Sequence, residues 1–453
     1  MYHYMSNVGT AIIHGDRKFS YQEFYERVDA VAGMANQFPE TTVGLFMDGR
    51  IESMEIYLGL ILAGKTVLPL PSYFPPQFTE MLKGSVGVEK IIGLGTGVID
   101  PSEISYEKQL LSSKGNDFQI SHDGGVVAMT SGTEGIPKIM KHGYHTISGG
   151  WEYEKKINFE HPEINQGYRS LLTAPMDSGV GIFSGLWYLA SGATVVMDNR
   201  PMTYDVIIDN VQKNECDLIS IYKTALRKII DAGHSINTMP SLKSIIETGS
   251  PSQKFIDQRV VESFGPILYN LYASSELGSI SMEKVGTDLG GKLRPHIKLD
   301  IQNKDELGIG EIWGSTDAMP LQIYGRTGIQ KVDRNDYLTS GDYGYLNEDG
   351  LLVIAGRRSD KIITSGYKVY AGLVEKEINA IDGVYRSAVI GVEDDKLGQK
   401  VVAYIDGTAN SDQIKRVLSD RLPFYMIPKE FNVVDKLPEG PTGKILKKDL
   451  VNS

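Results

Sequence analysis

The stretch Thr130-Ser131-Gly132-Thr133-Glu134-Gly135-Ile136-Pro137-Lys138 is rich in glycine and hydroxyl groups, ends on a lysine and follows the apolar, strand-like run Gly125–Met129. Such a loop brings backbone N–H groups and hydroxyls close to an anion, with the lysine as a mobile positive charge, so it predicts a phosphate-binding loop and a nucleotide ligand. An ordinary turn is the alternative, because the same residue types cluster in connecting loops. The loop differs from a Walker motif, in which Gly-Lys-Ser/Thr opens a helix, since Pro137 precedes the lysine here.

Four further motifs follow this loop along the chain. They are Tyr272-Ala273-Ser274-Ser275-Glu276, Ser340-Gly341-Asp342, Gly356-Arg357-Arg358-Ser359-Asp360 and Pro441-Thr442-Gly443-Lys444. Together with the loop they resemble the adenylate-forming superfamily, which contains acyl- and aryl-CoA ligases, carrier-loading adenylation domains and luciferases. The resemblance runs from about Ser20 to Leu450, which is nearly the whole chain.

The composition is that of an ordinary globular protein. The length of 453 residues allows roughly two to four domains, and a hydrophobic content of 41% suffices for a large core. A net charge of −11 argues against binding to a nucleic-acid backbone, which needs a concentrated basic face. The single cysteine, Cys216, excludes an internal disulfide and fits a reducing compartment, and we expect it to be a buried structural thiol.

The sequence shows no sign of membrane targeting. The N-terminal residues lack a basic region followed by an apolar core, so no signal peptide is expected. The best apolar run, Tyr57–Ala63, is too short to span a bilayer. We therefore expect a cytoplasmic protein without a membrane span.

Helical and strand-like segments alternate through most of the chain. A helix is expected over Tyr21–Met34 with Ser20 as its N-cap, and a second helix, Ile51–Ala63, lies between the strands Thr42–Met47 and Thr66–Leu70. Strands alternating with helices imply a parallel sheet with right-handed crossovers. The alternation continues through Ser170–Ala174, Gly181–Ala190, Thr194–Met197, Tyr204–Asn214, Leu218–Ile221, Ser244–Glu247 and Ile267–Leu271.

The pattern changes near Gly310–Gly314 to short strands of antiparallel character. The strand-like segment Gly350–Arg358 enters a charged turn, where we expect a domain boundary. A compact α+β unit follows. We therefore predict an α/β protein with a large N-terminal domain containing parallel sheets, residues 1–356, and a small α+β C-terminal domain, residues 357–453. The resemblance implies that the large domain is multi-layered and that the small one is mobile. The elements expected in the small domain are a short strand pair, the helix Leu373–Ile381, the strands Ser387–Val392 and Lys400–Ile405, and the helix Ser411–Leu422.

The resemblance implies how the chain brings together two anions, a carboxylic acid and the triphosphate of ATP. The glycine-rich loop would hold the β- and γ-phosphates, with Thr133 and Lys138 as the main contacts. Glu134 stands where many relatives have a second hydroxyl residue, and a carboxylate beside phosphates is unfavourable unless it turns away or meets the metal. The residues assigned to phosphate binding are Thr130, Ser131, Gly132, Thr133, Gly135 and Lys138.

The second motif corresponds to adenine and metal binding in the superfamily. Glu276 matches the Mg²⁺ ligand, Ser275 the hydroxyl near the α-phosphate, and Tyr272 the ring against the adenine. One carboxylate together with phosphate oxygens and waters is a sufficient Mg²⁺ site. Read alone, Tyr272 is a core residue and Glu276 a charge at a helix N-terminus.

The resemblance also assigns the ribose. Asp342 matches the aspartate that accepts hydrogen bonds from both ribose hydroxyls, a task suited to a carboxylate, and Arg357 matches an arginine that reaches the same sugar. A plain turn aspartate is the alternative. The segment Glu247–Pro251, with Gly249 and Ser250, resembles the turn that runs beside the adenine and the substrate.

The C-terminal part carries the remaining correspondences. Lys444 matches the lysine of the mobile domain that bridges the substrate carboxylate and the α-phosphate, as suits an ammonium on a flexible stem; read locally, this tail is a solvated basic helix start. Gly366 resembles the glycine that lines the pantetheine tunnel after the small domain rotates, with a simple turn glycine as the alternative. Ser359 departs from the Asp or Lys usual at the hinge, and Asp360 follows it.

The substrate pocket is the least determined part. We expect it to include Met176, Asp177, Ser178 and Gly179, where many acyl-CoA ligases have an aromatic residue and His in place of Asp177 and Ser178. The spacing of this region favours acyl- and aryl-CoA ligases over amino-acid-activating domains, yet Asp177 lies one residue from the place of the aspartate that binds an amine there. Tyr222-Lys223 replaces a proline-containing turn. Asp177 and Lys223 are either surface residues or contacts to a polar substrate group.

These observations imply an AMP-forming acid–thiol ligase that uses ATP and Mg²⁺. A small-molecule carboxylate and ATP would give an acyl-adenylate, from which a thiol displaces AMP. No carrier motif follows Lys444, so the thiol is coenzyme A, which we favour, or the phosphopantetheine of a separate acyl or peptidyl carrier protein. One alternative is a stand-alone adenylation enzyme that loads an amino or aryl acid onto a carrier. The other is a catalytically silent nucleotide-binding regulator, against which Lys138, Glu276, Asp342 and Lys444 argue.

Overall fold

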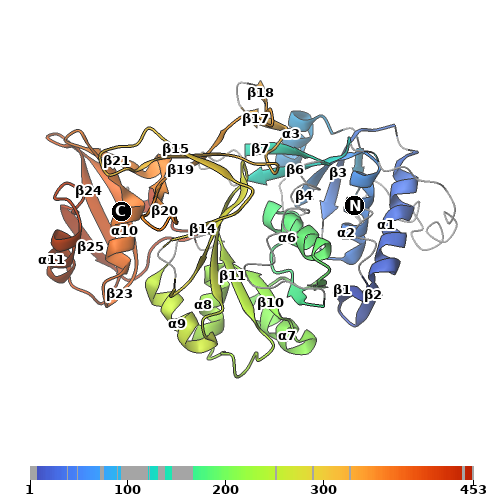
Figure 1. Ribbon diagram of the computed structural model, residues 1–453, viewed down its shortest axis with the longest axis horizontal. Coiled ribbons are helices and arrows are strands. Elements are labelled where there is room, and N and C mark those ends of the chain that lie inside the picture. The colour runs from blue at the N-terminus through green and yellow to red at the C-terminus, as the bar shows by residue number, and fades with distance from the viewer. Residues whose placement is uncertain are drawn as a thin grey trace. The chain divides into compact units, whose positions relative to one another are not determined.

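A computed structural model describes residues 8–37, 39–47, 49–71, 76–88, 90–92, 121, 123–130, 138–144, 167–249, 253–287, 290–325, 328–440 and 444–450. The chain forms two compact units, each built from helices and sheets (Figure 1). Unit 1 contains Met1–Ser220, Ser241–Lys243 and Thr316–Asp336. Unit 2 contains Ile221–Pro240, Ser244–Ser315 and Tyr337–Ser453.

Unit 1 contains a seven-stranded sheet in the order β18-β17-β7-β6-β4-β3-β5. Strands β5, β3, β4 and β6 run parallel, whereas β7, β17 and β18 continue the sheet in antiparallel pairs. The strands are β3 (Thr42–Met47), β4 (Thr66–Pro71), β5 (Lys90–Ile92), β6 (Gly125–Thr130), β7 (Lys138–Gly143), β17 (Gln322–Gly325) and β18 (Gly328–Lys331).

Helices α2 (Ile51–Leu62) and α3 (Pro76–Val86) pack on this sheet, and α1 (Tyr21–Ala35) packs on α2. Helix α1 begins with the expected cap, because the Ser20 side chain accepts a hydrogen bond from the Glu23 N–H while the Glu23 carboxylate accepts from the Ser20 N–H. Helix α2 is buried on almost every side. The buried Glu55 of α2 is therefore paired, with Arg27 of α1 at 3.1 Å.

A second group of strands in unit 1 lies in the order β10-β8-β9-β1-β2. Strands β10, β8, β9 and β1 pair in parallel, as expected where strands alternate with helices, and β2 closes a hairpin with β1. Cys216 lies just before β10 and is fully buried, which confirms its structural role. The elements are β1 (Thr10–His14), β2 (Arg17–Ser20), β8 (Arg169–Leu171), α6 (Gly179–Ala190), β9 (Thr194–Met197), α7 (Tyr204–Asn214) and β10 (Leu218–Ile221).

The first part of unit 2 contains four strands in the order β14-β13-β12-β11. Strands β11 and β12 are parallel, and helices α8 and α9 lie side by side next to them (Figure 1). A separate antiparallel sheet follows in the order β15-β16-β19-β20. The elements are α8 (Lys223–Asp231), β11 (Ser244–Thr248), α9 (Lys254–Phe264), β12 (Leu268–Ser274), β13 (Gly278–Lys284), β14 (Lys292–Leu293), β15 (Lys298–Gln302), β16 (Gly310–Ser315), β19 (Leu338–Leu346) and β20 (Leu352–Arg357).

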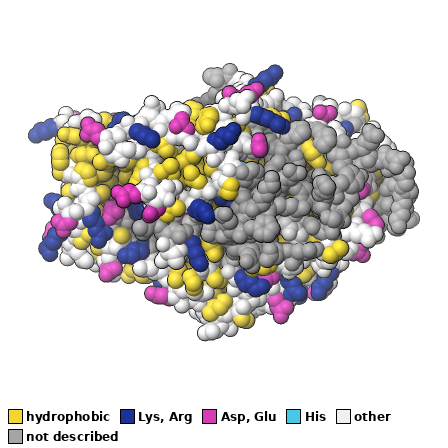
Figure 2. All heavy atoms as spheres, in the orientation of Figure 1, with side chains coloured by type: hydrophobic (Ala, Val, Ile, Leu, Met, Phe, Trp, Pro, Cys, Tyr) yellow, Lys and Arg dark blue, Asp and Glu magenta, His cyan; other side chains and the backbone are white. Residues whose placement is uncertain are grey.

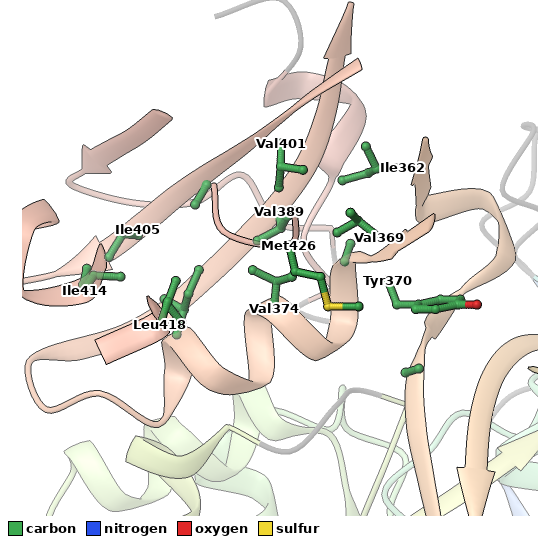
Figure 3. Packing of buried hydrophobic residues seen from close by; sticks show 14 of the residues in the cluster. Ile362, Val369, Tyr370, Val374, Val389, Val401, Ile405, Ile414, Leu418 and Met426 are labelled. Atoms are coloured by element: carbon green, nitrogen blue, oxygen red, sulfur yellow. The ribbon is translucent and has the colours of Figure 1, made fainter. Parts of the chain in front are cut away.

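The C-terminal part of unit 2 is the α+β arrangement that the sequence predicts. Its sheet has the order β22-β21-β24-β23, with β25 paired to β24. Buried side chains from α10, α11 and the sheet form its core, including Val374, Val389 and Leu418 (Figure 3). The elements are the short 3₁₀ helix η2 (Arg358–Asp360), β21 (Lys361–Thr364), β22 (Tyr367–Tyr370), α10 (Ala371–Asn379), β23 (Val384–Asp394), β24 (Gly398–Gly407), α11 (Ser411–Arg421), β25 (Glu430–Val434) and η3 (Lys447–Leu450).

Of the helices within these described ranges, none combines the length and the apolar character that a bilayer crossing requires.

Candidate active site

The centre of the site in unit 2 is the buried carboxylate of Asp342, which lies on β19 with 4% of its surface exposed. Strand pairing sets Asp342 opposite Arg357 of β20, and the Arg357 Nε lies 3.1 Å from Asp342 Oδ1. The Tyr272 hydroxyl, from β12, donates to Asp342 Oδ2 at 2.6 Å. Three separate strands therefore fix the orientation of one acceptor group.

The electrostatics of this centre follow from its burial. Burial raises the pKa of Asp342, although the Arg357 guanidinium and the Tyr272 hydroxyl both favour the charged form. Burial also raises the pKa of Tyr272 well above its usual value, and the Asp342 charge adds to this, so the hydroxyl stays protonated and donates. A desolvated acceptor held between two donors suits ligand hydroxyls, which can take over hydrogen bonds in a water-poor site.

Glu276 and Lys444 lie close enough to Asp342 for their charges to act on it. Glu276 raises the pKa of Asp342 and Lys444 lowers it. Glu276 lies in the turn between β12 and β13, closed by a hydrogen bond of 3.2 Å from the Leu277 N–H to Ser274 Oγ. The alternative interpretation of Glu276 as a charge at a helix N-terminus is therefore wrong. Ser275 lies in the same turn.

The tail that carries Lys444 is anchored by the neighbouring Lys447. The Lys447 Nζ lies 2.6 Å from Glu375 Oε1 of α10 and 3.1 Å from Asp360 Oδ2 of η2. Burial lowers the pKa of Lys447, but these two carboxylates outweigh it and the pKa is raised. The local interpretation of the tail as a solvated helix start holds in part, because Lys444 is exposed and η3 begins at Lys447. Lys447 itself is not freely solvated, since it ties the tail to α10 and to Asp360, the residue after Ser359.

The glycine-rich loop is described only at its ends. Thr130 is the last residue of β6 and Lys138 the first of β7, and the two face each other in an antiparallel pair. The lysine thus begins a strand and not a helix, in agreement with the difference from a Walker motif. The predicted phosphate contacts Ser131, Gly132, Thr133 and Gly135 lie outside the described residues, as do Glu134, Ser250 and Gly443.

The predicted pocket residues lie at the start of α6 in unit 1. Ser178 is the N-cap of this helix, since its Oγ accepts from the Gly181 N–H at 3.0 Å and donates to the Pro175 carbonyl at 2.7 Å. Met176 is buried, Gly179 is the first residue of α6, and Asp177 is half-buried. Burial raises the pKa of Asp177. Asp177 is therefore not a freely solvated surface carboxylate.

Lys223 is neither a surface residue nor a free substrate contact. It is 4% exposed, and its ammonium lies 3.0 Å from Asp257 Oδ1 and 3.4 Å from Glu247 Oε2. Lys223 is therefore neither a surface lysine nor a contact to a polar substrate group, because its ammonium is paired with two buried carboxylates. Its sequence neighbours revealed nothing of this, because both carboxylates come from other elements.

Gly366 has a clear role in a turn. Thr364 of β21 pairs with Tyr367 of β22, which leaves Ser365 and Gly366, both with positive φ (49° and 84°), as a two-residue hairpin loop. A Cβ at Gly366 would meet no atom within 4 Å, so the requirement for glycine is conformational. The adjacent Tyr367 is exposed, and its ring stacks on that of Tyr425 with the ring centroids 4.5 Å apart. Figure 2 shows hydrophobic side chains at the surface of the C-terminal part of unit 2.

Asn270 is a candidate that the sequence interpretation missed. It precedes Tyr272 by two residues on β12, so both side chains share one face of the strand. Both atoms of its amide are buried and find no hydrogen-bond partner among the described residues. An amide presents donors and an acceptor together, as the edge of a purine base requires. The signal was available, since asparagine is a poor strand former placed inside an otherwise apolar strand.

A metal would find one suitable ligand here. Glu276 supplies a carboxylate near Asp342, whereas no cluster of three or more His, Cys, Asp or Glu side chains suited to a metal occurs in the described part of the chain. Mg²⁺ retains waters and binds phosphate oxygens, so one carboxylate fits an ion that arrives with a nucleotide.

Comparison with known proteins agrees with this geometry. The family model described as AMP-binding enzyme matches residues 7–319, and the model described as AMP-binding enzyme C-terminal domain matches residues 373–444. A 2-succinylbenzoate–CoA ligase from Lactococcus lactis subsp. lactis is 25% identical over 429 residues, which cover 91% of this chain and 90% of that one. A Staphylococcus epidermidis protein, provisionally named a long chain fatty acid-CoA ligase, VraA, is 24% identical over 378 residues, covering 77% and 78%.

Solved structures share the fold. The apo form of MatB from Rhodopseudomonas palustris matches with a TM-score of 0.81 at 19% identity, covering 98% of this chain and 96% of that one. The amide bond synthetase McbA from Marinactinospora thermotolerans also matches with a TM-score of 0.81, at 18% identity, covering 99% and 98%.

Proposed function

The chain belongs to the AMP-binding enzyme family, and from this membership we propose that it is an AMP-forming acid–thiol ligase whose thiol is coenzyme A. It activates a carboxylic acid with ATP to an acyl-adenylate, releases pyrophosphate, and transfers the acyl group to the thiol. The observation that carries the proposal is the convergence of Tyr272, Glu276, Asp342, Arg357 and Lys444 within unit 2.

Each of these groups has a chemical task in the first step. Asp342 accepts hydrogen bonds from the ribose hydroxyls, and Arg357 holds that carboxylate in place and reaches the same sugar. Tyr272 offers its ring to the adenine, and Asn270 offers its amide to the edge of the base. Lys444 lies between the two anions that must meet, the substrate carboxylate and the α-phosphate, and reduces their repulsion. Mg²⁺, held by Glu276 and the phosphates, would neutralise further phosphate charge.

We propose that the phosphate-binding role belongs to the loop Thr130–Lys138 and that Gly249 and Ser250 line the nucleotide. We also propose that residues 1–356 and 357–453 are the functional domains, with a hinge near Ser359 and Asp360. The influence of Lys444 on Asp342 supports an arrangement suited to adenylate formation. The cytoplasm, where ATP and coenzyme A are available, is the proposed compartment.

Pyrophosphate release with a panel of fatty, aryl and amino acids tests the function. We expect release with an acid of the first two classes, followed by thioester formation with coenzyme A. A second candidate, an adenylation enzyme for an amino acid, is favoured by the half-buried carboxylate of Asp177. Release with amino acids alone and transfer only to a carrier protein would select it. Failure of every acid to support pyrophosphate exchange would leave a nucleotide-binding regulator.

Glu276→Gln is expected to weaken Mg²⁺-dependent activity, because it removes the charged metal ligand while keeping the size of the side chain. The measurement is the rate of pyrophosphate release across a magnesium titration, in which the variant should need more Mg²⁺ for half-maximal rate. Wild-type turnover at every magnesium concentration would place the metal elsewhere.

The pH dependence of adenylate formation should report on Lys444. Its pKa lies below the usual lysine range because desolvation disfavours the ammonium and Arg357 repels it, while Asp360 and Asp342 act in the opposite direction. Only the protonated form can bridge two anions, so kcat/KM, which reports the pKa values of the free protein, should fall with rising pH before an ordinary lysine loses its proton. Lys444→Arg, which stays charged, should lack this alkaline decline in a profile from about pH 6 to pH 10. The same decline in both proteins would assign it to another group.

Gly366→Leu is expected to block thiol capture and to spare adenylate formation, because a side chain there would obstruct the passage of pantetheine. The hairpin makes a control necessary, since leucine tolerates a positive φ poorly and asparagine tolerates it better. Gly366→Asn should therefore keep the wild-type melting temperature and still slow thioester formation. The readouts are single-turnover pyrophosphate release and thioester yield from supplied acyl-adenylate. Equal loss in both steps would reject the assignment.

A further inference from the structure

Lys223 stands at the centre of a buried ion cluster that the reaction does not use. The exposed fractions of the Lys223, Glu247 and Asp257 side chains are 5%, 1% and 3%. Burial lowers the pKa of Lys223, but the two carboxylates outweigh it and the pKa is raised, so the lysine is charged. We name these three residues the Lys223 cluster.

The cluster joins three segments of unit 2. Lys223 is the first residue of α8, Glu247 belongs to β11, and Asp257 belongs to the first turn of α9. Asp257 uses both oxygens: Oδ1 accepts from the Lys223 ammonium at 3.0 Å and Oδ2 from the Gln253 N–H at 2.8 Å. One ammonium therefore sets the positions of the α8 start, the end of β11 and the α9 start.

These three segments form one edge of the proposed nucleotide site. In the β11–β12 pair Thr248 is opposite Leu271, so Gly249 follows at the level of Tyr272. Gly249 has a φ of 90°, and a Cβ built on it would lie 3.4 Å from the Tyr222 ring. The ring of Tyr222, the residue before Lys223, therefore packs on the Gly249 backbone, which follows β11 at the level of Tyr272 on the neighbouring strand.

We infer that Lys223 is a positioning residue for the nucleotide site: it holds the Tyr222 ring against Gly249 and thereby fixes the backbone at the level of Tyr272. This inference rests on the proposed function, which places the nucleotide at Tyr272 and Gly249. Stability alone does not explain the cluster, because hydrophobic residues of similar volume often replace a buried ion pair without loss of stability. A buried charged cluster instead restricts the conformation, because any arrangement that separates the three groups leaves a buried charge without its partner.

The test separates positioning from stability by measuring AMP binding by calorimetry and the melting temperature on the same full-length proteins. Lys223→Met should raise the dissociation constant for AMP about tenfold, the equivalent of about one lost hydrogen bond, and should lower the melting temperature. The charge-free variant Lys223→Met/Glu247→Gln/Asp257→Asn should recover most of the melting temperature and keep the weaker binding. Lys228→Met, on an exposed position of the same helix, is the matched control and should change neither.

A double-mutant cycle identifies the route of the effect. If Lys223 acts through Tyr222, then Tyr222→Ala should weaken AMP binding, and the pair Tyr222→Ala/Lys223→Met should cost no more than either change alone. Wild-type AMP affinity in the charge-free variant, or additive losses in the cycle, would overturn the inference. Failure of the wild-type protein to bind AMP would instead overturn the proposed function.

Discussion

Replacing Lys444 by alanine is expected to slow adenylate formation by about 10²–10³-fold, or roughly 3–4 kcal/mol, as is typical when one electrostatic contact to a developing charge is lost. The charge of Lys444 acts on Asp342, and in its proposed role the ammonium lies between two anions while they approach. Thioester formation from a supplied acyl-adenylate should be largely retained, because that step no longer joins an acid to a phosphate.

The measurement compares single-turnover pyrophosphate release with thioester yield from supplied adenylate. Lys448→Ala, on the same tail, is the control and should leave both steps close to wild type. Equal losses in the two half-reactions of Lys444→Ala would reject the role of Lys444 as the bridge between the anions.

The second large effect is on stability. Lys223→Met leaves two almost completely buried carboxylates without their ammonium, which typically costs about 3–5 kcal/mol of unfolding free energy. For a unit of this size the melting temperature should fall by roughly 10 °C. Thermal unfolding followed by circular dichroism measures the change, with Lys228→Met as the reference.

The charge-free variant Lys223→Met/Glu247→Gln/Asp257→Asn shows whether charge or packing causes this loss of stability. If the uncompensated carboxylates are responsible, neutralising Glu247 and Asp257 as well should restore most of the lost stability. A melting temperature that stays low in the charge-free variant would mean that packing of the lysine stem, rather than its charge, stabilises the three segments.

The sequence predicts the fold well where the information is local. Ser20 caps the first helix as expected, and the helix Tyr204–Asn214 and the strand Thr194–Met197 have the bounds that the pattern indicates. The strand expected over Ser170–Ala174 begins and ends earlier, at Arg169–Leu171, because the chain turns toward the Ser178 cap of α6. A run of apolar residues does not show at which residue the strand ends and the turn begins.

The site could be predicted only in part for a different reason. Tyr272, Asp342 and Arg357 were identified because each lies in a motif, and the structure brings them together. The sequence does not reveal the ion partner of Lys223, because Asp257 is 34 residues away and belongs to another helix. The ion pairs of Lys447 are not visible in the sequence for the same reason, since Glu375 and Asp360 are far from it along the chain and close to it only in space.

The hydrogen bonds of Asp342 have a consequence for the thermodynamics of ligand binding. Tyr272 and Arg357 already hold both carboxylate oxygens in the free protein, so the entropy of ordering this side chain is lost during folding and not during association. In its proposed role Asp342 would therefore offer the ribose hydroxyls an acceptor whose direction is already fixed. Recognition would then depend on how well those hydroxyls match that direction, so Asp342 would contribute to discrimination among nucleotides more than to affinity.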